Sequence, residues 1–212
     1  NEVTEEDEIV TLSQMLRSFS IDWIVSIGFL CAIMLEVTMG DWSTILARQE
    51  FGVSKSVAVT PYFLFTGAVI IGRFTYTKFR GGRSDKEMVQ PLVLFGATSF
   101  LAGLFGGLAL KDFNLHLGFS LFCLGTFLAG LGLSFIGPLF FNYASARSDK
   151  PGGVVVAELG ALNQVLTFAG RNVIALVAGA TTLPMAMIIP AVMMMAVFFF
   201  IAAASQPRKP KK

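Results

Sequence analysis

NVIALVAGATTLPMAMIIPAVMMMAVFFFIAAASQP, residues 172–207, runs for 36 residues without Asp, Glu, Lys or Arg. A helix crosses the hydrocarbon core of a bilayer with about 20 apolar residues, so this stretch is nearly twice the length of one crossing. The segment GATTLP, residues 179–184, supplies a break, because its glycine, threonines and proline interrupt helices. The stretch therefore predicts two membrane-spanning helices joined by a short turn.

The rest of the chain has the same character. Residues 89–110 and 117–146 also lack charged side chains, and 54% of the chain is hydrophobic while only 14% is charged. A soluble domain carries more charge and less apolar surface, so this composition excludes a soluble fold. We expect an all-α membrane protein whose six transmembrane helices form one bundle. The predicted helices are residues 20–47, 56–77, 88–110, 116–145, 154–180 and 183–205.

Lysine and arginine are distributed unevenly between the two sides of this six-helix arrangement. One side holds 11 of them and the other holds 3, with two more inside helices. The richer side carries Arg17, Lys78, Arg80, Arg83, Lys86, Arg147, Lys150, Arg208, Lys209, Lys211 and Lys212, and the poorer side carries Arg48, Lys55 and Lys111. Because positive loops stay in the cytoplasm, we expect both termini there, in a multi-pass protein of the cell membrane, in bacteria the inner membrane.

The segments outside the bundle are residues 1–19 and 206–212. The chain begins with the acidic NEVTEEDE, which is unlike a signal peptide. The simplest interpretation is that the chain is part of a longer protein, although a processed start would look the same. Apolar residues between Ile9 and Phe19 recur at helical spacing, which fits either a short helix on the membrane face or a linker. Residues 206–212 form a basic tail.

Sequence motifs for nucleophilic catalysis, zinc hydrolysis, phosphate binding or haem attachment are absent. The two cysteines, Cys31 and Cys123, lie in apolar stretches where a thiol behaves as a small hydrophobic group. We therefore expect neither an enzyme nor a cofactor, metal or nucleic-acid partner. Glycines such as Gly103 and Gly107 are expected to let helices pack closely within the molecule, and Gly137-Pro138 is the best candidate for a bend that moves.

Charged residues inside the predicted helices need a reason, because an ionised side chain in hydrocarbon is costly. At 1.5 Å of rise per residue, Glu36 lies about 22 Å into the membrane and Asp41 about 30 Å, at the outer surface. The two acids point about 140° apart around the helix. Asp41 beside Trp42 is therefore predicted to be a surface anchor and the cap of a further helical turn, whereas Glu36 is the buried acid.

Arg171 on the fifth helix lies about 25 Å in, close to the predicted depth of Glu36. We expect these two residues to pair, either as a structural ion pair or as part of a substrate or proton-coupling site. Asn163 and Gln164 on the same helix complete the candidate binding residues. On the second helix, Arg73 is expected to be an anchor near the cytoplasmic face, with Glu158 as its candidate partner.

The chain resembles, over nearly all of its length, the C-terminal six-helix half of a major facilitator superfamily (MFS) transporter. The pattern E-x-x-x-x-D-W-S at residues 36–43 resembles the first helix of that half in bacterial fucose-permease-like or drug-transporter-like members. GRFTYTKFRGGRSDK, residues 72–86, resembles the family's basic loop, with Arg83 near its end, but lacks the usual acid before the basic pair. The acidic entry segment and the tail PRKPKK resemble the end of the interdomain loop and the basic C-terminus.

The resemblance implies a twelve-helix protein in which a solute binds at the midplane between two six-helix bundles and reaches either side by alternating access. The partners would be the bilayer, a missing N-terminal half, a small solute and protons, as symport or antiport. The leading hypothesis is a secondary active transporter. The alternative is a six-helix membrane scaffold without transport activity, which assembles through its glycine-rich faces.

Overall fold

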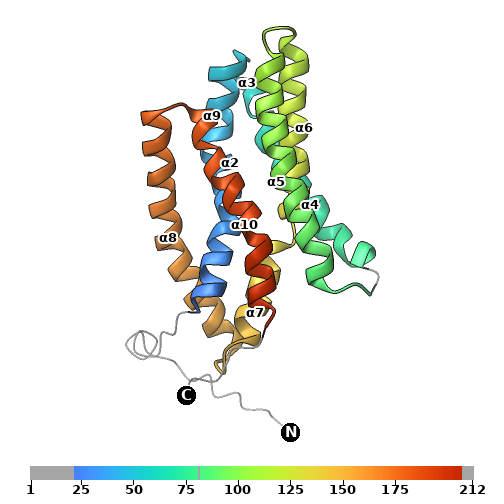
Figure 1. The fold of residues 1–212 in the computed structure, drawn as a ribbon, viewed down its shortest axis with the longest axis vertical. Coiled ribbons are helices and arrows are strands. Elements are labelled where there is room, and N and C mark those ends of the chain that lie inside the picture. The colour runs from blue at the N-terminus through green and yellow to red at the C-terminus, as the bar shows by residue number, and fades with distance from the viewer. Residues whose placement is uncertain (1–21, 81, 207–212) are drawn as a thin grey trace.

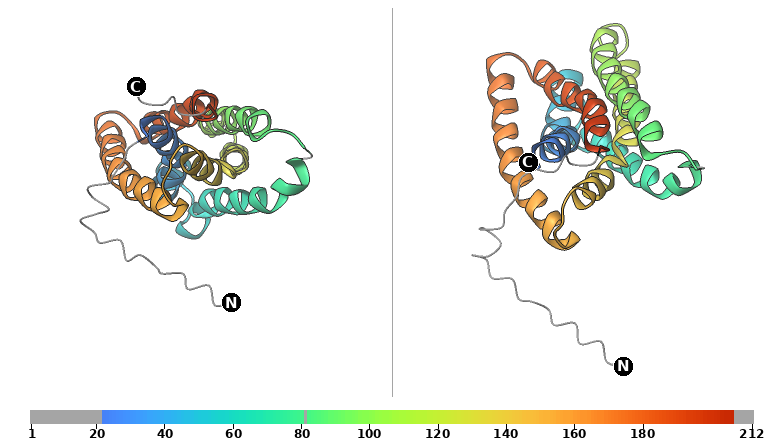
Figure 2. Two further views of the ribbon diagram at one scale, coloured as in Figure 1. Left: turned by 90° about the horizontal axis from the view of Figure 1, so that it is seen from below. Right: turned by 60° about the horizontal axis from the view of Figure 1, so that its bottom comes forward.

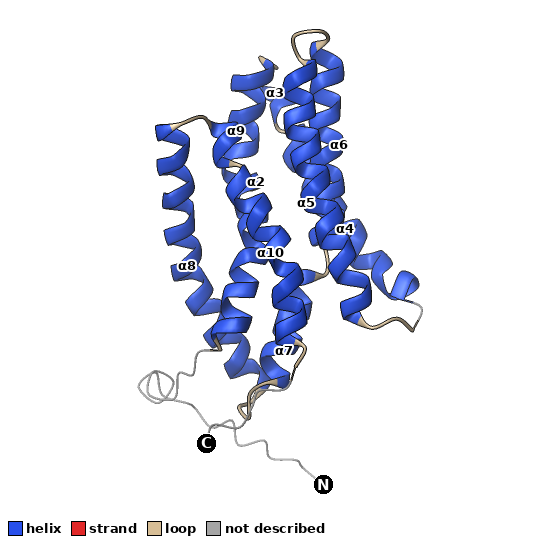
Figure 3. Ribbon diagram, in the orientation of Figure 1, coloured by secondary structure: helices blue, strands red, loops and turns tan. Residues whose placement is uncertain are grey.

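The computed structural model describes residues 22–80 and 82–206. These residues form helices joined by short turns, with no strand in the part described (Figure 3). The helices are α2 Trp23–Phe51, α3 Lys55–Ala58, α4 Thr60–Arg80, α5 Asp85–Leu110, α6 Leu115–Leu133, α7 Ile136–Ala146, α8 Gly152–Ala180, α9 Leu183–Ala186 and α10 Ile188–Ala204. The predicted fold class is confirmed.

Six candidate membrane spans, each long and apolar enough to cross a bilayer, match the six predicted helices. They are Trp23–Phe51, Lys55–Thr75, Lys86–Leu110, Leu115–Ala146, Gly152–Ala180 and Leu183–Ala204. Three of these regions are divided, between α3 and α4, between α6 and α7, and between α9 and α10. Residues 1–19, predicted to form either a short interfacial helix or a linker, lie outside the described residues, as does the predicted tail at 206–212 except for Gln206.

The described chain begins and ends at the same end of the bundle, which we call the near end (Figure 1). The loops at the opposite, far end connect α2 to α3, α5 to α6, and α8 to α9. An even number of spans places both ends of the described chain on one side, as the predicted distribution of lysine and arginine between the two sides requires. Which end faces the cytoplasm stays a prediction.

Polar side chains set where several helices begin. The carboxylate of Asp22 accepts hydrogen bonds from the backbone N–H groups of Ile24 and Val25 at the start of α2. Ser84 and Glu87 cap each other's backbone at the start of α5. The Thr182 hydroxyl accepts from Met185 at the start of α9. Each of these side chains satisfies a backbone donor that has no partner within its helix.

Helix α2 packs against α10, α7, α8 and α4, and in the view from the near end it lies beside α8 and α10 (Figure 2). Helix α5 packs closely against α6, where glycines meet. A Cβ atom added to Gly103 would lie 2.6 Å from Cα of Gly125, and one added to Gly96 would lie 2.9 Å from Cα of Gly132. The glycines of this pair therefore serve packing within the bundle, as expected.

Pro138 accounts for the interruption between α6 and α7. A proline inside a helix has no N–H and its ring clashes with the carbonyl of residue i−4, which here is Ser134. The helical ladder stops at Leu133 and restarts at Ile136, with the Ser134 N–H reaching only to the Leu131 carbonyl at 3.4 Å. The fourth span is thus interrupted close to the predicted position, and the movement of this bend stays a prediction.

Candidate functional site

An ion pair between α2 and α8 dominates the candidate site. Nε of Arg171 lies 3.0 Å from Oδ2 of Asp41, and the two side chains are 50% and 35% exposed. The predicted pairing of Arg171 with Glu36 is therefore wrong. Within the described chain no ion pair or hydrogen bond of Glu36 is found.

The reason for this difference is the position at which the two helices begin. Helix α2 begins at Trp23 and α8 at Gly152, where residues 20 and 154 were predicted. Counted from the observed starts, Asp41 lies about 27 Å along α2 and Arg171 about 28 Å along α8, whereas Glu36 lies only about 20 Å along. The arginine is level with Asp41.

Asp41 also lacks its predicted role as a cap. Helix α2 continues without a break from Trp23 to Phe51, so Asp41 lies within it and no further turn restarts there. Gly40 has no special backbone conformation, and a Cβ atom added to it would meet only Tyr62 of α4, at 3.7 Å. Asp41 is thus a helix-surface carboxylate held by a guanidinium.

Glu36 lies one turn before Gly40, on the side of α2 that borders Tyr62. Its side chain is half-buried. The other acids associated with α2 have cationic partners: Asp22 pairs with Arg147 at 2.8 Å, Asp41 with Arg171, and Glu50 with Lys111 at 2.9 Å. Among the described residues, Glu36 is the acid of this helix that no cation neutralises.

Gln164 and Asn163 face different surroundings. Gln164 is exposed and precedes Arg171 by seven residues, which puts both on one face of α8 about 10 Å apart along the axis. Asn163 is only 2% exposed. Its Nδ2 donates to the Leu159 carbonyl at 3.1 Å, while its Oδ1 and the hydroxyl of Thr167 have no partner in the described structure. Of the two predicted residues, Gln164 therefore shares the face of Arg171.

The charges near the other end do not pair as expected. Glu158 is buried and accepts a bond from Nζ of Lys150 at 2.6 Å, so its predicted pairing with Arg73 is wrong. Arg73 instead donates from Nε to the backbone carbonyl of Ser134 at 3.2 Å. The difference arises because Glu158 lies on α8 within reach of the loop that follows α7, whereas Arg73 on α4 packs against α6. Arg83 is exposed in the turn before α5.

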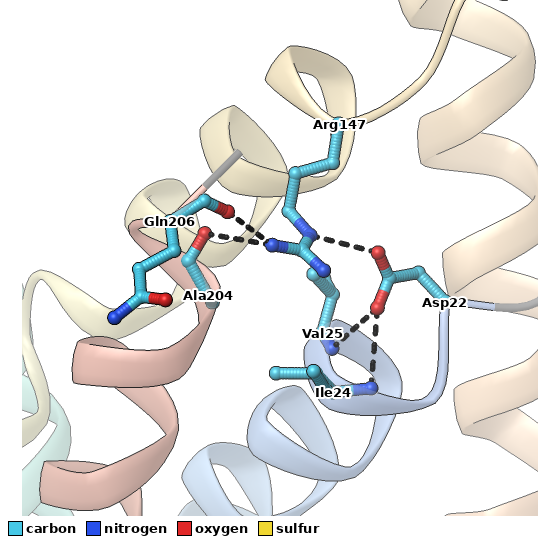
Figure 4. Close-up of polar contacts among 6 residues, drawn as sticks. All are labelled: Asp22, Ile24, Val25, Arg147, Ala204 and Gln206. Atoms are coloured by element: carbon cyan, nitrogen blue, oxygen red, sulfur yellow. Dashed lines mark hydrogen bonds and ion pairs between the residues drawn. The ribbon is translucent and has the colours of Figure 1, made fainter. Parts of the chain in front are cut away.

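Sequence reasoning missed a cluster that joins three elements at the near end (Figure 4). Nε of Arg147 donates to Oδ2 of Asp22, and its Nη1 donates to the carbonyl oxygens of Ala204 and Gln206. Arg147 is the C-terminal cap of α7 and Asp22 is the N-terminal cap of α2, while the two carbonyls lie at the last residue of α10 and two residues beyond it. The cap position of Asp22 was a usable signal, but nothing in the sequence indicated which cation meets it.

An open cavity of about 430 Å³ follows the Asp41–Arg171 pair toward the far end. Trp42, Ile45, Gln49 and Glu50 line it from α2, Ala175, Ala178 and Gly179 from α8, and Thr182 and Leu183 from the turn and α9. Trp42 directly follows Asp41, and Ala175 lies one turn after Arg171. The ion pair thus lies next to a partly polar hollow between the first and fifth spans. Among the described residues, no three His, Cys, Asp or Glu side chains gather as a metal site would require.

The sequence is similar to an uncharacterized MFS-type transporter from Yersinia pestis. The two are 25% identical over 166 residues, which cover 77% of this chain and 41% of that protein. The chain therefore spans less than half the length of this relative. No protein-family model matches the chain, and no solved structure matches it.

Proposed function

We propose that this chain is one six-helix half of an MFS secondary transporter, and that the α2–α8 face carrying Asp41 and Arg171 contributes half of a solute site. The similarity to the Yersinia pestis transporter and the six candidate spans support the class of protein. The observation that carries the site is the Asp41–Arg171 ion pair, 35% and 50% exposed, on the surface of two largely apolar spans. The narrower likeness to fucose-permease-like or drug-transporter-like members belongs to this proposal too.

The exposure of this pair argues against a face covered only by lipid. Intramembrane charges face a protein interior or water, because each is costly in hydrocarbon. In the proposed transporter a second six-helix bundle would cover this face and enclose a polar cavity with it. Alternating access would then move the cavity between the two sides of the membrane, with both termini in the cytoplasm.

The chemistry of the pair suggests the class of solute. The guanidinium of Arg171 has five N–H donors, and its Nε lies against Asp41, so its remaining donors are available to an anionic or hydroxyl group. Gln164 adds an amide on the same face. We therefore propose a small polar or amphipathic solute, for which Arg171 supplies the anchor and Asp41 fixes the orientation of the guanidinium.

Glu36 is the proposed proton-coupling group. It lies one and a half turns before Asp41 on α2, and no cation in the described structure holds its charge. Asp41, in contrast, is already engaged by the guanidinium of Arg171. Coupling would therefore separate two roles, with solute contact at Arg171 and proton exchange at Glu36.

The scaffold hypothesis is less well supported. It requires glycine-rich faces that are free to bind another copy, whereas the glycines of α5 and α6 face one another inside the bundle. It also leaves the exposed ion pair without a use. Transport is the function that accounts for both features.

The test begins with the complete transporter, carrying both bundles, purified in detergent. A panel of small carboxylates, sugars and amphipathic amines is screened for thermal stabilisation, since a ligand that binds the folded state raises its stability. Uptake of each stabilising solute is then measured in proteoliposomes. We expect Arg171→Ala to abolish uptake, and Lys111→Ala, which breaks the pair at the far end, to leave it intact. Normal uptake by the Arg171→Ala variant would refute the proposed site.

Glu36 is tested in the same vesicles. We expect Glu36→Gln to lose uptake driven by a proton gradient but to keep exchange of labelled for unlabelled solute, because exchange needs no net proton movement. Asp41→Asn is the matched acid variant on the same helix and should impair both modes through the loosened guanidinium. Gradient-driven uptake at the wild-type rate in the Glu36→Gln variant would contradict the coupling role.

A further inference from the structure

The carbonyl of Ser134 has lost its normal partner within the fourth span. In a continuous helix this oxygen would accept a hydrogen bond from the N–H of residue 138, four positions later. Residue 138 is proline, which has no N–H to give. Ser134 is completely buried, so water does not readily replace the missing donor.

A side chain from another helix takes the place of that donor. Nε of Arg73, on α4, donates to the Ser134 carbonyl at 3.2 Å. The preceding residue, Gly72, brings the two helices together, since a Cβ atom added there would clash with the hydroxyl and Cβ of Ser134. The Ser134 hydroxyl itself donates to the Leu131 carbonyl at 2.8 Å. Gly72 therefore allows α4 to approach the interruption between α6 and α7, and Arg73 donates an N–H to the Ser134 carbonyl there.

The hydrogen bond from Arg73 differs in one respect from the backbone hydrogen bond that it replaces. A backbone N–H is fixed to its own helix, whereas the Arg73 donor belongs to α4 and ends a flexible side chain. The last hydrogen bond at the break therefore forms only while α4 and the α6–α7 junction keep their relative position. A shift of either helix would release it, and the bend could then change without breaking any bond within α6 or α7.

We propose that Arg73 is a positioning residue that couples the bend between α6 and α7 to the position of α4, by donating the hydrogen bond that Pro138 removes. The role depends on the N–H at Nε and not on the positive charge. It is therefore distinct from a charged anchor at the membrane surface. It concerns the conformation of the bundle and requires no particular solute.

The side chains of glutamine and lysine separate these two roles. Nε2 of glutamine is as many bonds from Cα as Nε of arginine, so Arg73→Gln keeps a neutral donor at the same place. Arg73→Lys keeps the charge but puts its nitrogen one atom further out. Arg73→Met removes both the donor and the charge. Arg83→Gln is the matched control, because it removes an exposed positive charge from the turn that follows the same helix.

The measurement is amide hydrogen exchange of the peptide covering residues 134–146 in the complete protein. We expect Arg73→Met to speed exchange there by about tenfold, the effect of one unsatisfied buried carbonyl. Arg73→Gln and Arg83→Gln should match the wild type, and Arg73→Lys should resemble Arg73→Met. Rescue by lysine and not by glutamine would overturn the proposal in favour of a charged anchor.

A second experiment restores the backbone N–H that Pro138 lacks. In a Pro138→Ala variant the alanine N–H is available to the Ser134 carbonyl, so Arg73→Met should cause no further change in exchange. An equal effect of Arg73→Met in both backgrounds would overturn the proposal, as would its having no effect in the wild type. Hydrogen exchange can be measured without transport. The proposed role of Arg73 and the proposed solute site are therefore tested independently of each other.

Discussion

Replacing Arg147 by methionine tests how much the near-end cluster stabilises the bundle. The change keeps much of the side chain's apolar length but removes the ion pair to Asp22 and the two bonds to the end of α10. The Arg147 side chain is 8% exposed and that of Asp22 is 18% exposed, so the pair is largely shielded from water.

The expected cost follows from this burial. Removing one partner of a buried pair costs about 3–5 kcal/mol because a charge is left without compensation. Asp22 retains its two backbone donors at the start of α2, which reduces the cost. We therefore expect Arg147→Met to lower the free energy of unfolding by about 2–3 kcal/mol.

The assay is unfolding of the purified protein by SDS titration in detergent micelles, followed by circular dichroism. Lys111→Met is the matched control, because its pair with Glu50 is 27% and 25% exposed and is expected to contribute only about 0.5–1 kcal/mol. Asp22→Asn keeps a good capping side chain and isolates the charge. Equal costs for Arg147→Met and Lys111→Met would refute the argument that burial makes the near-end cluster stronger.

Two further predictions concern packing and orientation. Gly125→Ala should lower the free energy of unfolding by about 1–3 kcal/mol, because the added Cβ would lie 2.7 Å from Cα of Gly103. Gly160→Ala is the control and should have no such cost, since nothing outside its own stretch of helix lies within 4 Å of its Cβ position. Equal stability of the two variants in SDS titration would contradict the close α5–α6 contact. In intact cells, a membrane-impermeant maleimide should label a cysteine placed at Phe113, at the far end, and not one placed at Asp149, at the near end, if the near end is cytoplasmic. Labelling of only the Asp149 site would reverse the assigned orientation.

The course of the spans could be predicted because it depends on the length of uncharged runs, which the sequence displays directly. The turn at GATTLP illustrates this, since Thr182 caps α9 within it. The partner of Arg171 could not be predicted from the sequence in the same way. A shift of two or three residues in where α2 and α8 begin moves a side chain by several ångströms along the axis, and that was enough to replace Glu36 by Asp41.

Contacts between a side chain and a backbone carbonyl are harder still to predict. The carbonyl that Arg73 meets has no residue type of its own, so no pattern of acids and bases reveals it. One signal was present: Pro138 leaves the carbonyl four residues earlier without a donor. A long cationic side chain on a neighbouring helix is then a candidate partner, but only the packing of Gly72 against Ser134 shows that α4 is close enough.

The acids associated with α2 connect the stability of the bundle with its proposed function. Asp22, Asp41 and Glu50 pair with cations from the end of α7, from α8 and from the α5–α6 turn. These contacts lie near the start, middle and end of α2 and tie it to three different elements. Glu36 is the exception, and it shares a face with Gly40 toward Tyr62 of α4. A half-buried acid without a cation adds no comparable tie to the bundle, and its presence in this largely apolar helix therefore agrees with the proposed role of Glu36 in proton coupling.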